Sequence, residues 1–193
     1  MKPLGVVLAG GLARRMGGGD KCLLPLGGGV LLDQVLTRLV PQTGPIALNA
    51  NGDPSRFDRF DLPVIPDSIE GFAGPLAGVL AGLDWAHAQG AAQIVTVAGD
   101  TPFFPSDLTA RLTQAASPAG LALAATPDGH RHPTFGLWPT ALRDDLRAAL
   151  TAGTRKVVAW TDGHGCGTAQ FDSEAAFFNV NTPEDLTTAQ ARL

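Results

Sequence analysis

Short, uninterrupted apolar runs recur along the chain, and they limit its fold more than any other feature. The runs are Leu4 to Ala9, Ile46 to Leu48, Pro63 to Ile65, Ile94 to Ala98 and Leu121 to Ala125. Apolar runs of this length are typical of strands that are buried on both faces. Because such strands need helices on either side of the sheet, the chain is predicted to contain a mainly parallel, buried sheet.

The segments between these runs carry leucine and valine at helical spacing. They are Leu32, Val35, Leu36 and Leu39, then Leu76, Val79, Leu80 and Leu83, then Leu108 and Leu112 after Pro105 and Ser106. The alternation predicts an α/β fold, an open sheet with helices on both faces. A further strand is expected over 132–138 and a further helix over 141–150. No linker separates these parts, so we expect one domain over residues 1–193.

The balance of charge argues against several classes of partner. Of the 193 residues, 14 are Lys or Arg and 18 are Asp or Glu, which gives a net charge of -4. A chain of this charge is not expected to bind nucleic acid or an anionic membrane surface. No apolar run is long enough for a membrane span and no signal cleavage site follows the start, so we expect a cytoplasmic protein. The two cysteines, Cys22 and Cys166, are expected to be free thiols.

The first apolar run leads into a glycine-rich, positively charged loop, "LAGGLARRMGGGDK", over residues 8–21. The glycines allow the backbone to approach an anion, while Arg14, Arg15 and Lys21 supply positive charge. The loop is not a Walker A motif, because Cys22 stands where a Ser or Thr would hold magnesium. A phosphate-binding loop is favoured over the alternative, a surface loop without a ligand.

Polar residues follow several of the predicted strands at their carboxyl ends, where open parallel sheets carry their sites. The first strand leads to Gly10 and Gly11, the second to "NAN" over 49–51, the third to Asp67 and the fourth to "GDTPF" over 99–103. A glycine loop, an amide and two carboxylates would then share one edge. This set suits a nucleoside triphosphate with a divalent metal. Asp67 has a second interpretation, as a turn residue after Pro66.

Two further patterns have structural explanations of their own. Gly74, Gly78 and Gly82 recur at every fourth residue and would clear one helix face, which favours close packing on the sheet over ligand approach. In "NVNTPEDL", over 179–186, Thr182 is a good helix cap with Pro183 at the first helical position. That explanation leaves Asn179 and Asn181 unaccounted for.

The loop over 8–21 resembles the signature loop of nucleotidylyltransferases with a Rossmann-like, glycosyltransferase-A type sheet. Among these, the chain is most similar to the molybdenum cofactor guanylyltransferases. The resemblance extends in order through "LNAN" (48–51), "PDSIEGFAGPLAGVLAGL" (66–83), "GDTPF" (99–103), "HPTFGLW" (132–138) and "NVNTPEDL" (179–186). It implies transfer of GMP from GTP to the terminal phosphate of molybdenum-bound molybdopterin, with release of pyrophosphate.

The resemblance also implies roles for individual residues. Those on the nucleotide are the backbone of Leu8, Ala9, Gly10 and Gly11, with Lys21 on the phosphates, Asn49 and Asp67 on the guanine nucleoside, and Asp100 on Mg²⁺. Lys21 and Asp100 are the expected catalytic residues, supported by Arg14 and Arg15. The acceptor side is placed at His132, Pro133, Asn179 and Asn181. The nucleotide half would span about 1–104 and the acceptor half about 105–193.

Other activities stay open at this stage. A sister enzyme would use CTP with the same acceptor, and a related transferase would activate a sugar phosphate. A non-enzymatic alternative is a GTP-binding chaperone for molybdoenzymes. The guanine-using branch tends to show "LAGG", as at 8–11, and this favours GTP. We expect a monomer whose partners are GTP and the molybdopterin cofactor, with molybdoenzymes or cofactor chaperones as further partners.

Overall fold

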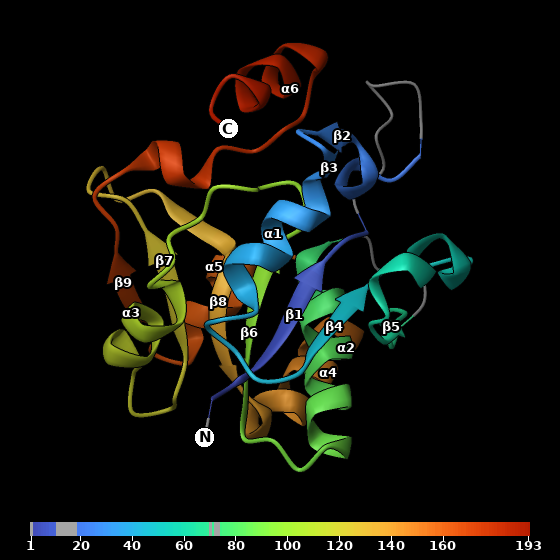
Figure 1. The fold of residues 1–193 in the computed structure, drawn as a ribbon. Helices are drawn as coiled ribbons and strands as arrows, with labels where there is room; N and C mark the ends of the chain where they lie inside the picture. Colours follow the sequence, from blue (N-terminus) through green and yellow to red (C-terminus); the bar gives the residue numbers. More distant parts are fainter. Residues whose placement is uncertain (1, 11–18, 70, 72–73) are drawn as a thin grey trace.

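The computed structural model describes residues 2–10, 19–69, 71 and 74–193 (Figure 1). In this part of the chain the apolar runs form a seven-stranded sheet of order β5-β4-β1-β6-β8-β7-β9. The strands are β1 (Leu4–Leu8), β4 (Ile46–Asn49), β5 (Val64–Ile65), β6 (Gln93–Ala98), β7 (Ala122–Ala125), β8 (Arg131–Pro139) and β9 (Gly167–Gln170). Only β8 runs against its neighbours, β6 and β7. The sheet is therefore mainly parallel, as predicted.

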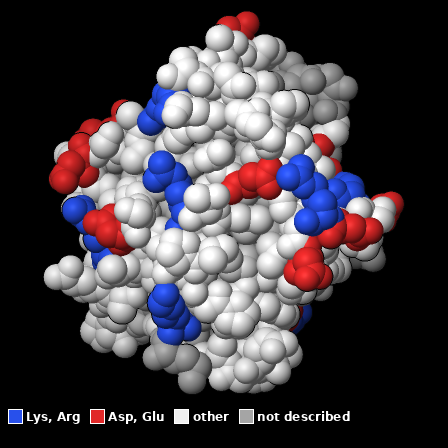
Figure 2. Space-filling model, viewed as in Figure 1, with Lys and Arg blue, Asp and Glu red and all other residues white. Residues whose placement is uncertain are grey.

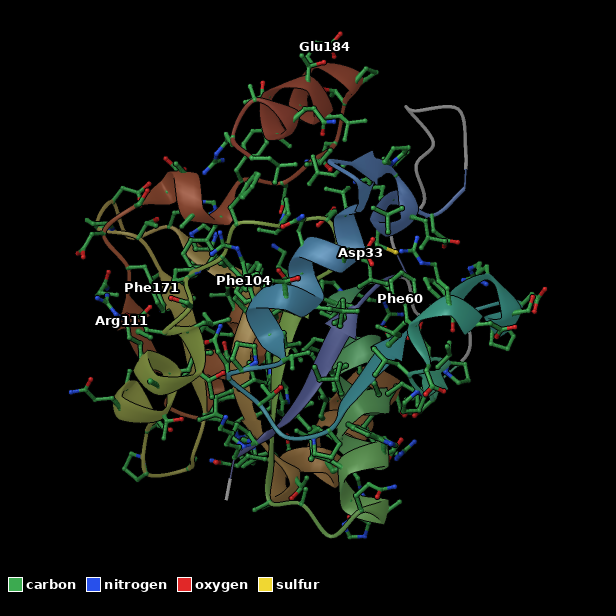
Figure 3. All side chains as sticks on the ribbon, viewed as in Figure 1. Asp33, Phe60, Phe104, Arg111, Phe171 and Glu184 are labelled. Carbon is green, nitrogen blue, oxygen red and sulfur yellow. The ribbon has the colours of Figure 1, made fainter. Side chains whose placement is uncertain are left out.

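Helices cover both faces of this sheet, again as predicted (Figure 1). They are α1 (Leu31–Leu39), α2 (Pro75–Ala88), α3 (Leu108–Ala115), α4 (Arg143–Thr151), α5 (Val157–Gly163) and α6 (Pro183–Gln190). Successive residues of β1 point to opposite faces of the sheet and pack against different helices. Val7 packs in the apolar cluster of α1 and α3, whereas Val6 packs in that of α2, α4 and α5. Figure 3 shows Phe104 beneath α1, inside the first of these clusters.

Two of the three regularly spaced glycines, Gly78 and Gly82, lie in α2 and clear its face as expected, whereas a Cβ on Gly74, just before α2, would meet no described atom within 4 Å. A Cβ on Gly82 would lie 2.8 Å from Ile94 Cδ1 and 2.9 Å from Val6 Cγ2, so this glycine lets the helix approach the sheet. A Cβ on Gly78 would lie 2.2 Å from Asn49 Oδ1. The space left by Gly78 therefore holds a polar side chain at the end of β4.

The C-terminal helix α6 lies at the carboxyl end of the sheet, beside the hairpin of β2 (Pro25–Leu26) and β3 (Gly29–Val30) (Figure 1). Thr182 caps α6 as expected, and it forms a capping box with Asp185: the Thr182 hydroxyl accepts from Asp185 N, and Asp185 Oδ2 accepts from Thr182 N at 2.9 Å. Leu26, Leu31, Val180 and Ala189 form a small separate core. This core joins α6 to the segment that follows Lys21.

Several elements were not predicted from the sequence. Among the described residues they are β2, β3, α5, β9 and the short 3₁₀ helices η2 (Lys21–Leu23), η3 (Pro54–Phe60), η4 (Thr140–Leu142) and η5 (Glu174–Phe177). Figure 2 shows acidic and basic side chains intermingled on the face that carries α1 and α3. Within the described residues, no helix has both the length and the apolar character needed to cross a membrane.

Candidate functional site

Strand register brings the predicted site residues to one edge of the sheet. Leu8 on β1 lies opposite Asn49 on β4 and Ala98 on β6, and Asn49 lies opposite Ile65 on β5. Residues just beyond this row leave the sheet at the same level. Asp67 and Asp100 each stand two positions after the last paired residue, so they emerge at the same edge.

Lys21 lies at the centre of the first polar group at this edge. Its Nζ is 3.4 Å from Asp100 Oδ2, and it also donates a hydrogen bond to Asn181 Oδ1. The Lys21 and Asp100 side chains are 19% and 20% exposed, so both remain accessible to a ligand. The structure thus joins three residues that lie up to 160 positions apart in the chain.

A backbone contact explains why Asn181 reaches this group. Val180 N donates to Asp100 O at 2.9 Å, which holds the 179–181 segment against the end of β6. Asn179 Oδ1 accepts from the Thr101 hydroxyl, and Asp185 Oδ2 accepts from Asn181 N at 2.9 Å. Asn179 and Asn181 were expected on the acceptor side. The structure places Asn181 in contact with Lys21, beside Asp100.

The second polar group joins β4 to the residues after β5. Asn49 Nδ2 donates to Asp67 Oδ1 at 3.0 Å, and Asn51 Nδ2 donates to Asp67 Oδ2 at 2.8 Å. Asn51 Oδ1 accepts in turn from Asp67 N at 2.8 Å. Asp67 is therefore held by two amides, which a turn residue alone would not require. Asn51 was expected at this edge as part of "NAN" but was given no role of its own, because its contact with Asp67 depends on the pairing of distant segments.

The backbone of Leu8, Ala9 and Gly10 leaves β1 between these two groups. Ala9 N donates to Asn49 O at 2.9 Å, and Gly99 N donates to Leu8 O at 3.1 Å. A Cβ added at Gly10 would meet no atom of the described residues within 4 Å. Gly11, Arg14 and Arg15 lie outside the described residues.

Cys22, next to Lys21, is a packing residue. It is 2% exposed, and burial, helped by the charge of Asp20, raises the pKa of its thiol to about 12. A thiol with this pKa stays protonated and is a poor nucleophile. Both cysteines are free, as predicted.

A pocket of about 390 Å³ lies beside the first polar group. Its lining is His130, His132, Glu174, Ala175, Phe177, Phe178 and Asn179. The His132 ring stacks on Phe177 with centroids 4.0 Å apart. Its Nε2 atom is buried with no hydrogen-bond partner among the described residues. Pro133 belongs to a bulge of β8, because Leu123 pairs with Gly136 while Ala124 pairs with His132. The pocket thus includes His132 and Asn179 but not Pro133.

His132 should make the stability of the protein depend on pH. Burial, with a smaller effect from nearby His130 and an opposing one from Asp128, lowers the pKa of His132 from 6.5 to about 4. Between these values the unfolded chain binds a proton that the folded protein does not, so stability falls as pH falls from 6.5 towards 4. We expect His132→Phe, which keeps the ring stack, to reduce the loss in Tm between pH 7 and pH 5 by a few degrees.

The measurement is Tm at both pH values for wild type, His132→Phe and His87→Gln. His87 lies on an exposed position of α2, so its replacement should leave the pH dependence as in wild type. An equal loss in Tm for wild type and His132→Phe would contradict the assignment.

The first polar group also has the donor chemistry for a magnesium ion. Among the described residues, no group of three His, Cys, Asp or Glu side chains could form a complete protein cage for a metal. Magnesium, however, is commonly held by one or two carboxylates together with substrate phosphates. The Asp100 carboxylate, with the Asn181 amide oxygen beside it, fits that kind of site.

Comparison with known proteins identifies the family of the chain. A family model described as a MobA-like NTP transferase domain matches residues 5–165. The chain belongs to the MobA-like NTP transferase family. Its members include a molybdenum cofactor guanylyltransferase of Mesorhizobium japonicum, 54% identical over 198 residues, covering 98% of this chain and 94% of the relative. One from Cereibacter sphaeroides is 49% identical over 193 residues, covering 100% and 98%.

Solved structures show the same MobA-like fold. The molybdopterin-guanine dinucleotide biosynthesis protein A of Archaeoglobus fulgidus superposes with a TM-score of 0.73 at 23% identity, over 98% of this chain and 97% of that one. A 2-C-methyl-D-erythritol 4-phosphate cytidylyltransferase of Thermus thermophilus superposes with a TM-score of 0.70 at 22% identity, over 100% and 98%. The architecture is thus shared with nucleotidyltransferases of different substrates.

Proposed function

We propose that the protein transfers GMP from GTP to the terminal phosphate of molybdenum-bound molybdopterin, forming the guanine dinucleotide cofactor and pyrophosphate. Its membership of the MobA-like family and the names of relatives about half identical over almost their full length support this activity. The observation that carries it in the structure is the meeting of Lys21, Asp100 and Asn181 at the carboxyl end of the sheet.

The reaction needs charge neutralisation more than it needs a nucleophile from the protein. An oxygen of the acceptor phosphate forms a bond to the α-phosphorus of GTP, while the bond from that phosphorus to the β-phosphate oxygen breaks and pyrophosphate leaves. An acceptor phosphate is largely ionised near neutral pH, so no general base is required. The protein's contribution is to bring two anions together and to stabilise the charge on the leaving group.

The two polar groups divide this work. Lys21 would turn its ammonium from Asp100 to the phosphates of GTP and so stabilise the departing pyrophosphate. Asp100 would hold Mg²⁺, which supplies Lewis-acid stabilisation of the phosphate oxygens when bound. Asp67, fixed by Asn49 and Asn51, offers carboxylate oxygens suited to the ring and exocyclic N–H groups of guanine. The pocket beside Asn179 would receive part of the acceptor.

The test is pyrophosphate release by purified protein with Mg²⁺, molybdenum-loaded molybdopterin and each nucleoside triphosphate in turn. The proposal expects release with GTP that depends on the acceptor. Release with CTP alone would indicate the cytidylyltransferase, and release that requires a sugar phosphate would indicate a different acceptor. GTP binding without turnover would indicate a chaperone.

The choice of base can be tested at Gly10. A methyl group there would contact no atom of the described residues, and because the backbone of Gly10 is expected to lie against the nucleotide, we expect the methyl group to act on the bound base. The larger purine needs closer backbone approach than a pyrimidine does, so Gly10→Ala should lower kcat/KM for GTP about 10-fold more than for CTP. The measurement is kcat/KM for both nucleotides.

Gly28→Ala is the matched control for this test. Gly28 lies in the turn between β2 and β3 and likewise has no described atom within 4 Å of an added Cβ. Its substitution should leave the ratio of GTP to CTP use unchanged. If the ratio of kcat/KM for GTP to that for CTP is unchanged in Gly10→Ala as well, guanine is selected by Asn49 and Asp67 instead of by the backbone at Gly10.

A further inference from the structure

One partly buried charge near the site takes no part in the proposed phosphate transfer. Asp20, directly before Lys21, has a side chain only 12% exposed. A carboxylate beside a lysine that receives phosphates would repel those phosphates, so its position requires another explanation.

Arg56, on η3, supplies the partner of this carboxylate. Its Nε lies 2.6 Å from Asp20 Oδ2 in an ion pair, and this nitrogen is buried and has no hydrogen-bond partner of suitable geometry among the described residues. Its Nη2 donates to Asn51 O at 2.6 Å, and its Nη1 donates to Asp53 O. The guanidinium also lies over the Phe57 ring, 4.8 Å from its centroid. Arg56 is therefore fixed from several sides before it meets Asp20.

Asp20 also fixes the turn that carries Lys21. Leu23 N donates to Asp20 O at 3.1 Å, so the Asp20 backbone begins the short helix η2 on which Lys21 stands. Its side chain is tied to Arg56, and the Arg56 guanidinium is tied to the backbone of Asn51. A continuous set of contacts thus connects the Asp67 group to Lys21.

We propose that Asp20 and Arg56 are a positioning pair, which sets Lys21 at the correct distance from the residues that hold the base. This inference rests on the proposed function for the role of Lys21. The pair fixes the spacing between the nucleoside end and the phosphate end of one ligand. Neither member needs to touch GTP.

A charge effect and a positioning effect of Asp20 predict opposite changes in GTP binding when Asp20 is replaced. If Asp20 acted on GTP only through its charge, its removal would strengthen binding, because a negative group would be lost beside the phosphates. If it positions Lys21, Asp20→Ala weakens nucleotide use, although the site becomes more positive. A displacement of Lys21 by about 1 Å is enough to cost a factor of about 10 to 100 in rate.

The experiment measures kcat/KM for GTP and the affinity for GTP with Mg²⁺ in six variants and their wild type. They are Asp20→Ala, Arg56→Met, Arg56→Lys, Lys21→Ala, Arg56→Met combined with Lys21→Ala, and the control Arg59→Met. Arg59 lies on the same helix and pairs with Asp33 of α1 at 3.0 Å. Figure 3 shows Asp33 on α1 and Phe60, next to Arg59 in the chain, on the neighbouring segment. Arg59→Met therefore breaks an ion pair of the same kind that does not involve the turn carrying Lys21.

We expect Asp20→Ala and Arg56→Met each to lower kcat/KM about 10-fold, Arg56→Lys to restore part of the loss, and Arg59→Met to stay within about twofold of wild type. The decisive readout is the combined variant. If Arg56 acts through Lys21, Arg56→Met costs nothing further once Lys21 is alanine. The same cost in both backgrounds, or tighter GTP binding by Asp20→Ala, would overturn the proposal.

The two proposals fail in different ways. A wild-type protein that binds GTP but transfers no GMP to molybdopterin contradicts the proposed function. The role of Asp20 and Arg56 in positioning Lys21 is then still tested by the affinities of the same variants for GTP with Mg²⁺.

Discussion

Asp100→Asn should lower the rate of GMP transfer about 1,000-fold while leaving the fold intact. The backbone contact of Asp100 with Val180 N does not involve the side chain, and asparagine keeps the shape and one oxygen. What is lost is the negative charge that faces Lys21 Nζ at 3.4 Å and that a divalent metal requires. The measurement is single-turnover transfer over a range of Mg²⁺ concentrations, with Tm as the check on folding.

Asp107→Asn is the control for this change. Asp107 carries an ion pair with Arg111 of α3 at 2.8 Å, and Figure 3 shows Arg111 near Phe171, on the part of the molecule that carries α3 and β9. Its replacement makes the same change of charge and should leave transfer within about twofold of wild type, because surface ion pairs contribute little. Asp100→Asn with a wild-type rate at limiting Mg²⁺ would remove Asp100 from the mechanism.

The sheet and its functional edge could be predicted from the sequence because both depend on local patterns. A strand buried on both faces must be apolar throughout, and polar residues directly after such a strand must leave the sheet at its carboxyl end. This reasoning found Asn49, Asp67 and Asp100, which the structure places at that edge. The family resemblance added Asn179 and Asn181, near the C-terminus, to the expected site residues.

Contacts between distant segments could not be predicted in the same way. The run 132–138 indicates a strand, but nothing in its pattern says that β8 is antiparallel and lies between β6 and β7. The acceptor role expected for Asn181 stays a prediction, but its contact with Lys21, which follows because Val180 N donates to Asp100 O, could not be read from the sequence. Arg56 was missed, and Asn51 was placed at the edge without a role, for the same reason: their partners are set by tertiary packing.

Short elements were missed for a second reason. The strand β9 (Gly167–Gln170) has only four residues, of which Ala169 alone is buried, and it pairs with β7 at the edge of the sheet. The Cβ that Gly167 lacks would lie 1.8 Å from Ala115 O, so this position is determined by the close approach of the end of α3. Such a constraint acts through neighbours in space and leaves no periodic pattern in the sequence.

Lys21→Ala should lower kcat for GMP transfer about 100-fold and weaken the binding of GTP, because a cation that stabilises the leaving pyrophosphate is lost. Folding should be unaffected, since the Lys21 ammonium contacts only side chains at the exposed edge of the site, Asp100 and Asn181, in the described part of the chain. Asp100→Asn and Lys21→Ala should also differ in how their rates depend on the Mg²⁺ concentration. Asp100→Asn should alter the dependence on Mg²⁺, whereas Lys21→Ala should keep that dependence and lose rate at every concentration.

Lys2→Ala is the matched control, because Lys2 donates to Pro41 O at 2.6 Å, in the loop before β4. It removes the same charge away from the site and should leave kcat and KM unchanged. The measurement is kcat and KM for GTP across Mg²⁺ concentrations in the three variants. If Lys21→Ala keeps wild-type kinetics, the glycine-rich loop is only a surface feature, and neither Lys21 nor the pair that positions it takes part in phosphate transfer.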